Sequence, residues 1–298
     1  MVTRTYTDTG QLFVVGYQGE QVPQSFVDLV GRRQLGGVIL FEDNCRSYTA
    51  ARESIAAIRK QYTRTAPMIA VDQEGGRVCR LRGVPAEFRA PADYARDNAL
   101  EQYAEDFSRA MVYMESLGIN CNLAPVCDLF LDEGNTCLDG RCFGDSPEVV
   151  GPFIEKSIKL ARTHGLLSCA KHFPGLGAAT IDPHEATAEA DYDLNTWSTR
   201  EMRPFEIAVR AQVDMIMTTH LRLPAIDDTI ATGSSKITDH MIRTMLGYEG
   251  PVITDDLLMS GAAELGDVGE RAIAAFLAGH DLLLFGQDTE AAIEAMEA

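Results

Sequence analysis

The sequence predicts an α/β protein built as a single-domain, TIM-like (β/α)8 barrel over residues 1–298. Eight short apolar runs alternate with eight segments of helical periodicity, which is typical of strands that helices cover on both faces. Hydrophobic residues make up 46% of the 298 residues, and this length fits one closed barrel. A doubly wound open sheet is the alternative, but no G-x-G-x-x-G motif follows the first apolar run.

The predicted strands are continuous apolar runs rather than alternating ones, because a parallel sheet is buried on both faces. The run Gly37-Val38-Ile39-Leu40-Phe41 is typical, with charged residues directly after it. The eight predicted strands are 12–16, 37–41, 68–71, 121–124, 166–170, 215–218, 252–254 and 281–285.

The predicted helices carry apolar residues at a spacing of three to four. Ser146 is a candidate N-cap before Pro147, and Gly165 ends the same helix. Pro152 is expected to kink this helix or to move its start further along the chain. The predicted helices are 23–33, 48–62, 94–117, 147–165, 201–212, 239–246, 270–279 and 289–298.

The chain is strongly acidic, which restricts its partners. A net charge of −18 argues against general binding of nucleic acid or of an anionic membrane, because both require a basic face. No apolar run is long enough to span a membrane, and residues 1–10 lack the apolar core of a secretory signal. The seven cysteines are scattered and form no C-x-x-C pair, so a reduced, cytoplasmic compartment is expected.

We expect no metal or other cofactor. Cys137 and Cys142 share a predicted loop with Asp132 and Asp139, which makes a zinc site conceivable. No second pair of ligands with suitable spacing accompanies them, so the sequence does not favour such a site.

Charged residues cluster directly after most of the predicted strands. The carboxyl ends of barrel strands share one mouth, where barrel active sites lie. Taken alone, each of these residues is as consistent with a structural role, as a turn residue, a solvated arginine or part of a salt-bridged rim, as with a functional role. For His220 and Asp128, a structural role at the barrel end is as consistent as a functional one. Their shared position favours a site for a hydroxyl-rich ligand made from Asp72, Arg77, Arg141, Lys171 and His172.

The segment after the fifth predicted strand carries a second polar set. Asp182 and His184 point to the same side if this segment is extended, and Pro183 favours the extended conformation. A carboxylate that orients an imidazole suits proton transfer near neutral pH. A surface loop with scattered polar residues is the alternative.

Asp255 and Asp256 directly follow the strand predicted at 252–254. Adjacent residues in an extended chain point to opposite sides, so one of the two faces the barrel mouth. That carboxylate is a candidate nucleophile, metal ligand or proton acceptor, and the structural alternative is a helix N-cap. The local pattern does not choose between the two residues.

Six motifs, in chain order and over nearly the whole sequence, resemble glycoside hydrolase family 3. The similarity is greatest to its single-domain β-N-acetylhexosaminidase branch. The motifs are V-D-Q-E-G-G-R-V-x-R-L at 71–81, L-A-P-V-x-D at 123–128, R-x-F-G at 141–144, K-H-F-P-G-x-G at 171–177, D-x-H at 182–184 and V-I-T-D-D-L-x-M at 252–259.

The resemblance implies a retaining glycosidase that forms a covalent glycosyl-enzyme on Asp255. It implies that His184 is the acid/base and that Asp182 orients it. The implied substrate is a small glycoside with terminal β-linked N-acetylglucosamine, as in muropeptide-like fragments of peptidoglycan recycling. We therefore expect a cytoplasmic monomer or weak dimer. The residues implied to hold the sugar hydroxyls are Asp72, Arg141, Lys171 and His172.

Two positions depart from the family pattern. Leu176 stands where a second His is usual, and Pro183 stands where Ser is frequent. Three other functions remain open: a β-glucosidase or β-xylosidase of the same family, a glycoside phosphorylase, and a catalytically silent barrel that binds sugar.

Overall fold

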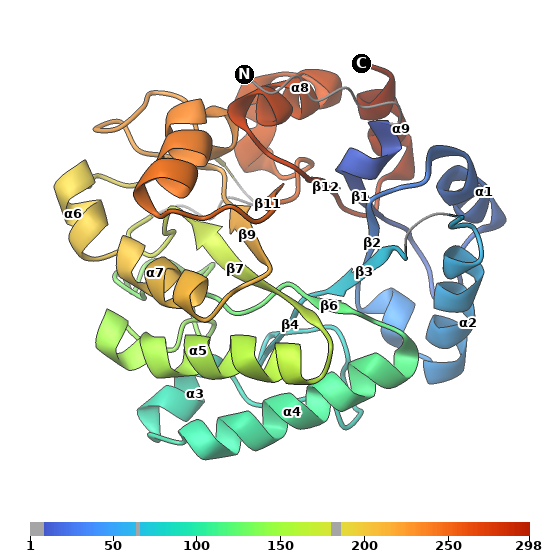
Figure 1. The fold of residues 1–298 in the computed structure, drawn as a ribbon, viewed down its shortest axis with the longest axis horizontal. Helices are drawn as coiled ribbons and strands as arrows, with labels where there is room; N and C mark the ends of the chain where they lie inside the picture. The colour runs from blue at the N-terminus through green and yellow to red at the C-terminus, as the bar shows by residue number, and fades with distance from the viewer. Residues whose placement is uncertain (1–8, 64–65, 180–185) are drawn as a thin grey trace.

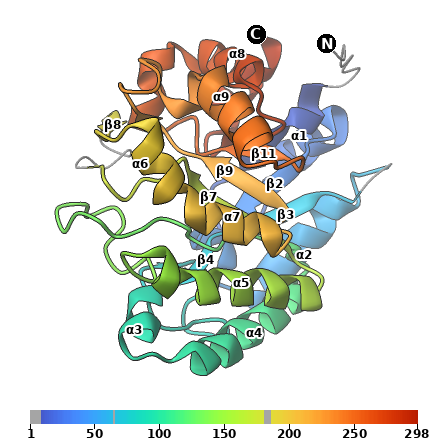
Figure 2. The same ribbon diagram turned by 60° about the vertical axis from the view of Figure 1, so that its left-hand side comes forward.

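The computed structural model describes residues 9–63, 66–179 and 186–298. Eight parallel strands pair in chain order, and a parallel bridge between Ile253 and Leu282 joins the last two. The predicted TIM-like (β/α)8 barrel is therefore confirmed, with the helices forming an outer ring around the strands (Figures 1 and 2). The barrel strands are β1 (Phe13–Gly16), β2 (Gly37–Leu40), β3 (Met68–Val71), β6 (Cys121–Asn122), β7 (Leu167–Phe173), β9 (Met215–Thr218), β11 (Val252–Thr254) and β12 (Leu283–Phe285).

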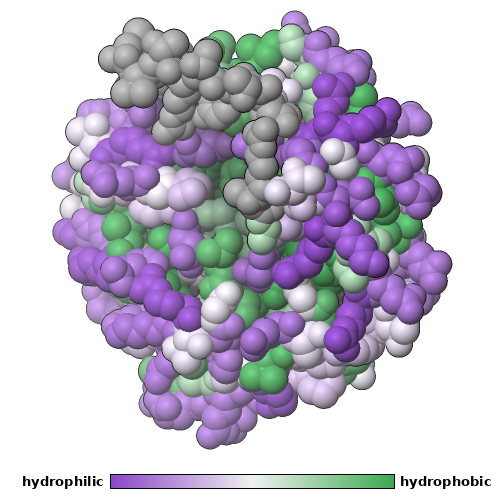
Figure 3. Space-filling view, turned by 45° about the vertical axis from the view of Figure 1, so that its right-hand side comes forward, coloured by the Kyte–Doolittle hydropathy of each residue, from purple (hydrophilic) through white to green (hydrophobic). Residues whose placement is uncertain are grey.

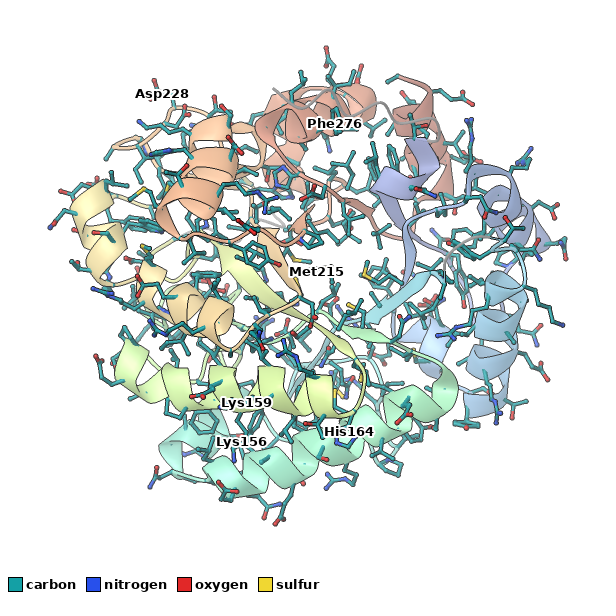
Figure 4. The ribbon with its side chains drawn as sticks, viewed as in Figure 1. Lys156, Lys159, His164, Met215, Asp228 and Phe276 are labelled. Atoms are coloured by element: carbon teal, nitrogen blue, oxygen red, sulfur yellow. The ribbon has the colours of Figure 1, made fainter. Side chains whose placement is uncertain are left out.

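The strands bury both of their faces, which explains their continuous apolar sequence. Met215 and Met217 of β9 point into the barrel, where Met215 is labelled in Figure 4. Ile216, between them, packs with the helices outside. This alternation follows from the two-residue period of a strand. The interior cluster consists of Val14, Ile39, Met68, Ala70, Cys121, Leu123, Cys169, Met215, Met217, Ile253 and Leu284.

Each of the eight predicted outer helices has a counterpart in the described residues, in the same order, and a short helix over Leu194–Thr199 is additional. Pro152 does not move the start of α5, which begins at Pro147. The segment predicted as a helix over 239–246 is a π-helix over Lys236–Met245. The helices are α1 (Gln24–Arg33), α2 (Tyr48–Arg59), α3 (Pro91–Arg96), α4 (Leu100–Leu117), α5 (Pro147–Thr163), α6 (Leu194–Thr199), α7 (Met202–Arg210), α8 (Val268–Ala278) and α9 (Thr289–Glu297).

Among the predicted boundaries that differ from the structure, two change an element substantially. The helix expected over 94–117 is divided into α3 and α4, because Asn98 adopts a left-handed φ of 50° between them. The fifth predicted strand, 166–170, ends too early, since β7 continues to Phe173. Lys171 and His172 therefore belong to a rigid strand and not to the loop after it.

The surface is rich in charge. Figure 3 shows a face on which hydrophilic residues predominate and hydrophobic ones are scattered among them. No helix in the described part of the chain combines the length and the apolar character that a membrane span requires.

The contact between α4 and α5 generates a stability prediction. Buried Tyr103 lies 2.6 Å from Ser157 Oγ, and Ser157 Oγ donates to the Phe153 carbonyl, so the tyrosine hydroxyl is the donor to Ser157. Tyr103→Phe should cost about 1 kcal/mol of unfolding free energy. A thermal melt should show Tm about 2–4 °C lower.

The matched control is Tyr113→Phe on the same helix, where the side chain is only partly buried and its hydroxyl has no hydrogen bond among the described residues. Its Tm should stay within about 1 °C of the wild-type value. Equal Tm values for Tyr103→Phe and the wild type would contradict the prediction.

Candidate active site

A cavity of about 490 Å³ opens at the carboxyl ends of the barrel strands. Four residues of the interior cluster line it, Ile39, Leu123, Met217 and Leu284, so the cavity stands directly on the barrel core. Charged and polar side chains surround this apolar floor. Those from the strand ends and the loops next to them include Asp72, Glu74, Arg141, Lys171, His172 and Asp255.

Glu74 is the most deeply buried carboxylate of the cavity. It lies in β4 (Gln73–Gly75), which follows β3 and forms a hairpin with β5 (Val78–Cys79). Its side chain is 1% exposed and accepts two hydrogen bonds from Arg141, at 2.8 and 2.9 Å. Lys171 Nζ lies 2.6 Å from Glu74 Oε1 and 2.6 Å from Asp72 Oδ1. Two carboxylates and two cations thus form one paired network.

The network fixes the charge of its members. Burial alone would raise the pKa of Glu74, but the charges of Arg141 and Lys171 overcome it and hold that pKa well below its usual value of 4.5. Burial would lower the pKa of Lys171, yet Asp72 and Glu74 raise it above its usual value. Both groups are therefore charged at neutral pH, and Lys171 is a hydrogen-bond donor rather than a general base.

A second chain of contacts holds His172. Asp128 Oδ2 lies 2.6 Å from His172 Nδ1 and also accepts the His172 backbone N–H at 3.1 Å. The other carboxylate oxygen of Asp128 accepts the Leu176 N–H at 2.6 Å. Because Nδ1 faces an acceptor, it carries the proton, and Nε2 is left to accept from Arg141 at 3.2 Å. For Asp128 the sequence leaves a structural role and a functional role equally open, and in the structure Asp128 supports the site through His172.

Asp255 and Asp256 both line the cavity, and each carboxylate accepts a backbone N–H. One oxygen of Asp256 accepts backbone N–H groups of Leu258 and Gly286, each at 3.0 Å. Asp256 therefore holds the end of β12 to the turn after β11. The Asp255 N–H donates to the Thr218 carbonyl at 3.0 Å, which fixes the residue at the end of the barrel ladder. Asp255 Oδ1 accepts the N–H of the adjacent Asp256 at 2.8 Å, and Asp255 is a candidate for chemistry.

Arg77 and Arg80 both line the cavity, in different ways. Exposed Arg77 donates to the backbone carbonyls of Asp139, Thr136 and Cys137, and so supports the loop before α5. One terminal guanidinium nitrogen of Arg80 lies 3.7 Å from Asp72 Oδ2, and Arg80 Nε has no hydrogen-bond partner among the described residues. Arg80 was not among the predicted site residues, although it closes the same R-V-x-R motif.

The structure brings six predicted residues to one cavity, while two lie outside the described residues. Asp182 and His184 are the two outside. Sequence reasoning missed Glu74 and Arg80. Glu74 follows Asp72 by two residues, the spacing of one strand face, which is the signal that was available. The six residues in the cavity are Asp72, Arg77, Arg141, Lys171, His172 and Asp255.

Across residues 9–63, 66–179 and 186–298, no three His, Cys, Asp or Glu side chains are grouped so that they could hold a metal ion. Cys137 and Cys142 are buried free thiols, and Cys137 contacts Arg141 through its sulfur at 3.5 Å.

Comparison with known proteins identifies the family. The profile of the glycosyl hydrolase family 3 N-terminal domain matches residues 6–298. The chain therefore belongs to glycosyl hydrolase family 3, as its motifs indicate.

Three relatives illustrate the similarity. A secreted glycosyl hydrolase of Arthroderma benhamiae is 34% identical, over 92% of this chain and 80% of that protein. A β-hexosaminidase of Xanthomonas axonopodis pv. citri is 30% identical, over 92% of this chain and 83% of that protein. A family 3 β-N-acetylglucosaminidase structure from Paenibacillus sp. str. FPU-7 has a TM-score of 0.91 at 29% identity. This chain is covered to 97% in that comparison but spans only 56% of the Paenibacillus chain.

The buried network makes a prediction about pH. Glu74→Gln leaves Lys171 and Arg141 with one carboxylate fewer, and should cost about 3–5 kcal/mol of unfolding free energy at pH 7. Since folding lowers the pKa of Glu74, its contribution is present above its usual pKa of 4.5 and is lost as the pH falls below that value. Thermal melts between pH 7 and pH 3 should therefore show the gap in Tm narrowing in acid.

The exposed Glu115 provides the control, and Glu115→Gln should leave Tm nearly unchanged at every pH. Two results would show that Glu74 is not held as a paired carboxylate. One is equal Tm values for Glu74→Gln and the wild type at pH 7, and the other is a difference in Tm that widens in acid.

Proposed function

We propose that this chain is a retaining exo-β-N-acetylglucosaminidase that releases terminal β-linked N-acetylglucosamine. The observation that carries the proposal is Asp255, which lines the cavity at the end of β11, facing a floor and walls suited to one sugar ring. An apolar floor suits the C–H face of a sugar, and the surrounding charges suit its hydroxyls. The β-hexosaminidase and β-N-acetylglucosaminidase names of the relatives support the N-acetyl specificity.

In the proposed first step, Asp255 attacks the anomeric carbon while the bond to the leaving oxygen breaks. His184 gives a proton to that oxygen, so a neutral alcohol departs and a glycosyl ester forms on Asp255. In the second step, His184 takes a proton from water, the water oxygen attacks the anomeric carbon and the carboxylate of Asp255 is released. Asp182 would orient the imidazole and favour its charged form.

The sugar hydroxyls are proposed to bind the network at the cavity wall. Asp72 accepts, and Lys171 and Arg141 donate, from positions that their mutual ion pairs hold still. His172 is fixed by Asp128 and adds a further polar contact. Arg80 joins this set through its position beside Asp72, while Arg77 stays a predicted contact whose hydrogen bonds to loop carbonyls also fit a supporting role.

The substrate source and the compartment are part of the same proposal. Muropeptide-like fragments fit an exo-acting pocket, because only the terminal sugar has to enter it. All seven cysteines are buried free thiols, which supports a reduced cytoplasm. Because one relative is named as secreted, the location of this protein should be tested separately, by cell fractionation.

The direct test compares Asp255→Asn with Asp256→Asn on a chromogenic β-N-acetylglucosaminide. Asp255→Asn should lose more than about 10⁴-fold in kcat/KM, because no nucleophile remains. Asp256→Asn keeps an oxygen that accepts the Leu258 and Gly286 N–H groups, so its loss should stay below about tenfold. His184→Ala should lose about 10²-fold to 10⁴-fold on a substrate with a poor leaving group.

Two controls define the reaction. The matching β-glucoside should turn over far more slowly than the N-acetyl substrate, and added phosphate should not yield a sugar 1-phosphate. Turnover of the β-glucoside at a similar rate would favour the glucosidase alternative. Retained activity in Asp255→Asn, together with its loss in Asp256→Asn, would overturn the assignment of the nucleophile.

A further inference from the structure

His220 is a buried histidine to which the proposed reaction assigns no role. It lies between β9 and the two-residue strand β10 (Leu221–Arg222), which pairs in parallel with β8 (Ala188–Glu189). Its side chain is fully buried, and it is not among the described residues that line the cavity. His220 therefore lies next to the site without lining the space that a sugar would occupy.

Both ring nitrogens of His220 have polar partners. Nε2 lies 2.9 Å from the carbonyl oxygen of Asp256, and because a carbonyl only accepts, Nε2 is the donor. Nδ1 lies 2.8 Å from Thr232 Oγ1, which also contacts the Thr219 carbonyl oxygen at 3.2 Å. Thr232 is fully buried in the 3-10 helix Ala231–Gly233. These contacts fix the imidazole between the loop after β9 and the turn after β11.

The end of β9 thereby holds the dipeptide Asp255-Asp256 at both of its ends. At the first end, the Asp255 N–H donates to the Thr218 carbonyl at 3.0 Å. At the second end, His220 donates to the Asp256 carbonyl. Between them, the Asp256 N–H donates to Asp255 Oδ1 at 2.8 Å. The backbone of Asp256 therefore connects the imidazole of His220 to the carboxylate of Asp255.

We propose that His220 is a positioning residue for the nucleophile, acting through the backbone of Asp256 on the carboxylate of Asp255. The inference rests on the proposed function, because it requires Asp255 to attack the anomeric carbon. Loss of the contact at the Asp256 carbonyl should let this backbone shift, and the carboxylate of Asp255 would shift with it. An attacking group that is misplaced by about 1 Å can lose about 10²-fold in rate.

The test uses a 2,4-dinitrophenyl β-N-acetylglucosaminide, whose leaving group departs without a proton. Its kcat/KM therefore reports attack by Asp255 and does not depend on the acid/base. His220→Leu removes the donor to the Asp256 carbonyl and should lower kcat/KM about 10-fold to 100-fold. The inhibition constant of free N-acetylglucosamine should stay within about twofold of the wild-type value, because the paired network that is proposed to hold its hydroxyls does not include His220.

A conservative variant and a matched control separate positioning from packing. His220→Gln can place an amide N–H near the position of Nε2, so its kcat/KM should return to within about fivefold of the wild-type value. The control is His280→Leu, because buried His280 also contacts a threonine hydroxyl and a backbone carbonyl, those of Thr218 and Ala275, each at 2.8 Å. His280→Leu should lower Tm as His220→Leu does, but change kcat/KM less than about twofold.

Thr232 gives a second way to disturb the same ring, should His220→Leu fail to fold. Thr232→Val removes the hydroxyl at Nδ1 and should lower kcat/KM about threefold to tenfold, whereas Thr232→Ser keeps the hydroxyl and should stay within about twofold. Adding Thr232→Val to His220→Leu should change little further, because both variants act on one contact.

Three results would overturn the inference. If the folded His220→Leu and Thr232→Val variants keep kcat/KM within about twofold while Asp255→Asn is inactive, the positioning role fails and the proposed function stands. If His280→Leu loses as much activity as His220→Leu, or His220→Gln recovers none, the effect is one of packing. If Asp255→Asn stays active on the dinitrophenyl substrate, the proposed nucleophile fails and the inference fails with it.

Discussion

The pairing of Glu74 with Arg141 and Lys171 is the interaction on which the geometry of the site depends. A buried carboxylate without partners would be costly, and so would either buried cation, so the three side chains fix one another. The network also fixes side chains that lie next to it. Arg141 contacts His172, His172 is held by Asp128, and Asp128 accepts the N–H of Leu176. These contacts hold the charged side chains of the cavity wall in fixed positions.

The barrel could be predicted because its eight strands are continuous apolar runs, and burial on both faces leaves that signal unbroken. The errors have physical causes. The polar side chains of Lys171 and His172 predict that the strand ends at Ala170, but β7 continues to Phe173. A buried strand end can hold these residues because Lys171 is paired with carboxylates. The division between α3 and α4 follows from one left-handed residue, Asn98, within a segment whose apolar spacing continues across it.

The site was predicted in part. Asp72, Lys171 and Asp255 lie at or directly after strand ends, and Arg141 lies in the loop after β6, so their shared position at the barrel mouth was enough to group them. Glu74 was missed although it follows Asp72 by two residues, because its burial and its pairing with Arg141 and Lys171 are tertiary contacts that the sequence does not show. The local pattern does not choose between Asp255 and Asp256, and the choice of Asp255 comes from the family resemblance. The backbone contacts of Asp256 agree with a supporting role for that residue.

The proposed retaining mechanism requires a covalent intermediate at Asp255. In a 5-fluoro analogue of β-N-acetylglucosaminyl fluoride, the ring fluorine slows both steps, while the fluoride leaving group keeps the first step fast. The second step should therefore be rate-limiting, and the glycosyl-enzyme should accumulate. Intact mass measurement should then show one added sugar per chain, and peptide mapping should place it on Asp255. A sugar attached to Asp256, or hydrolysis of the analogue with no covalent adduct at any time, would show that Asp255 is not the nucleophile.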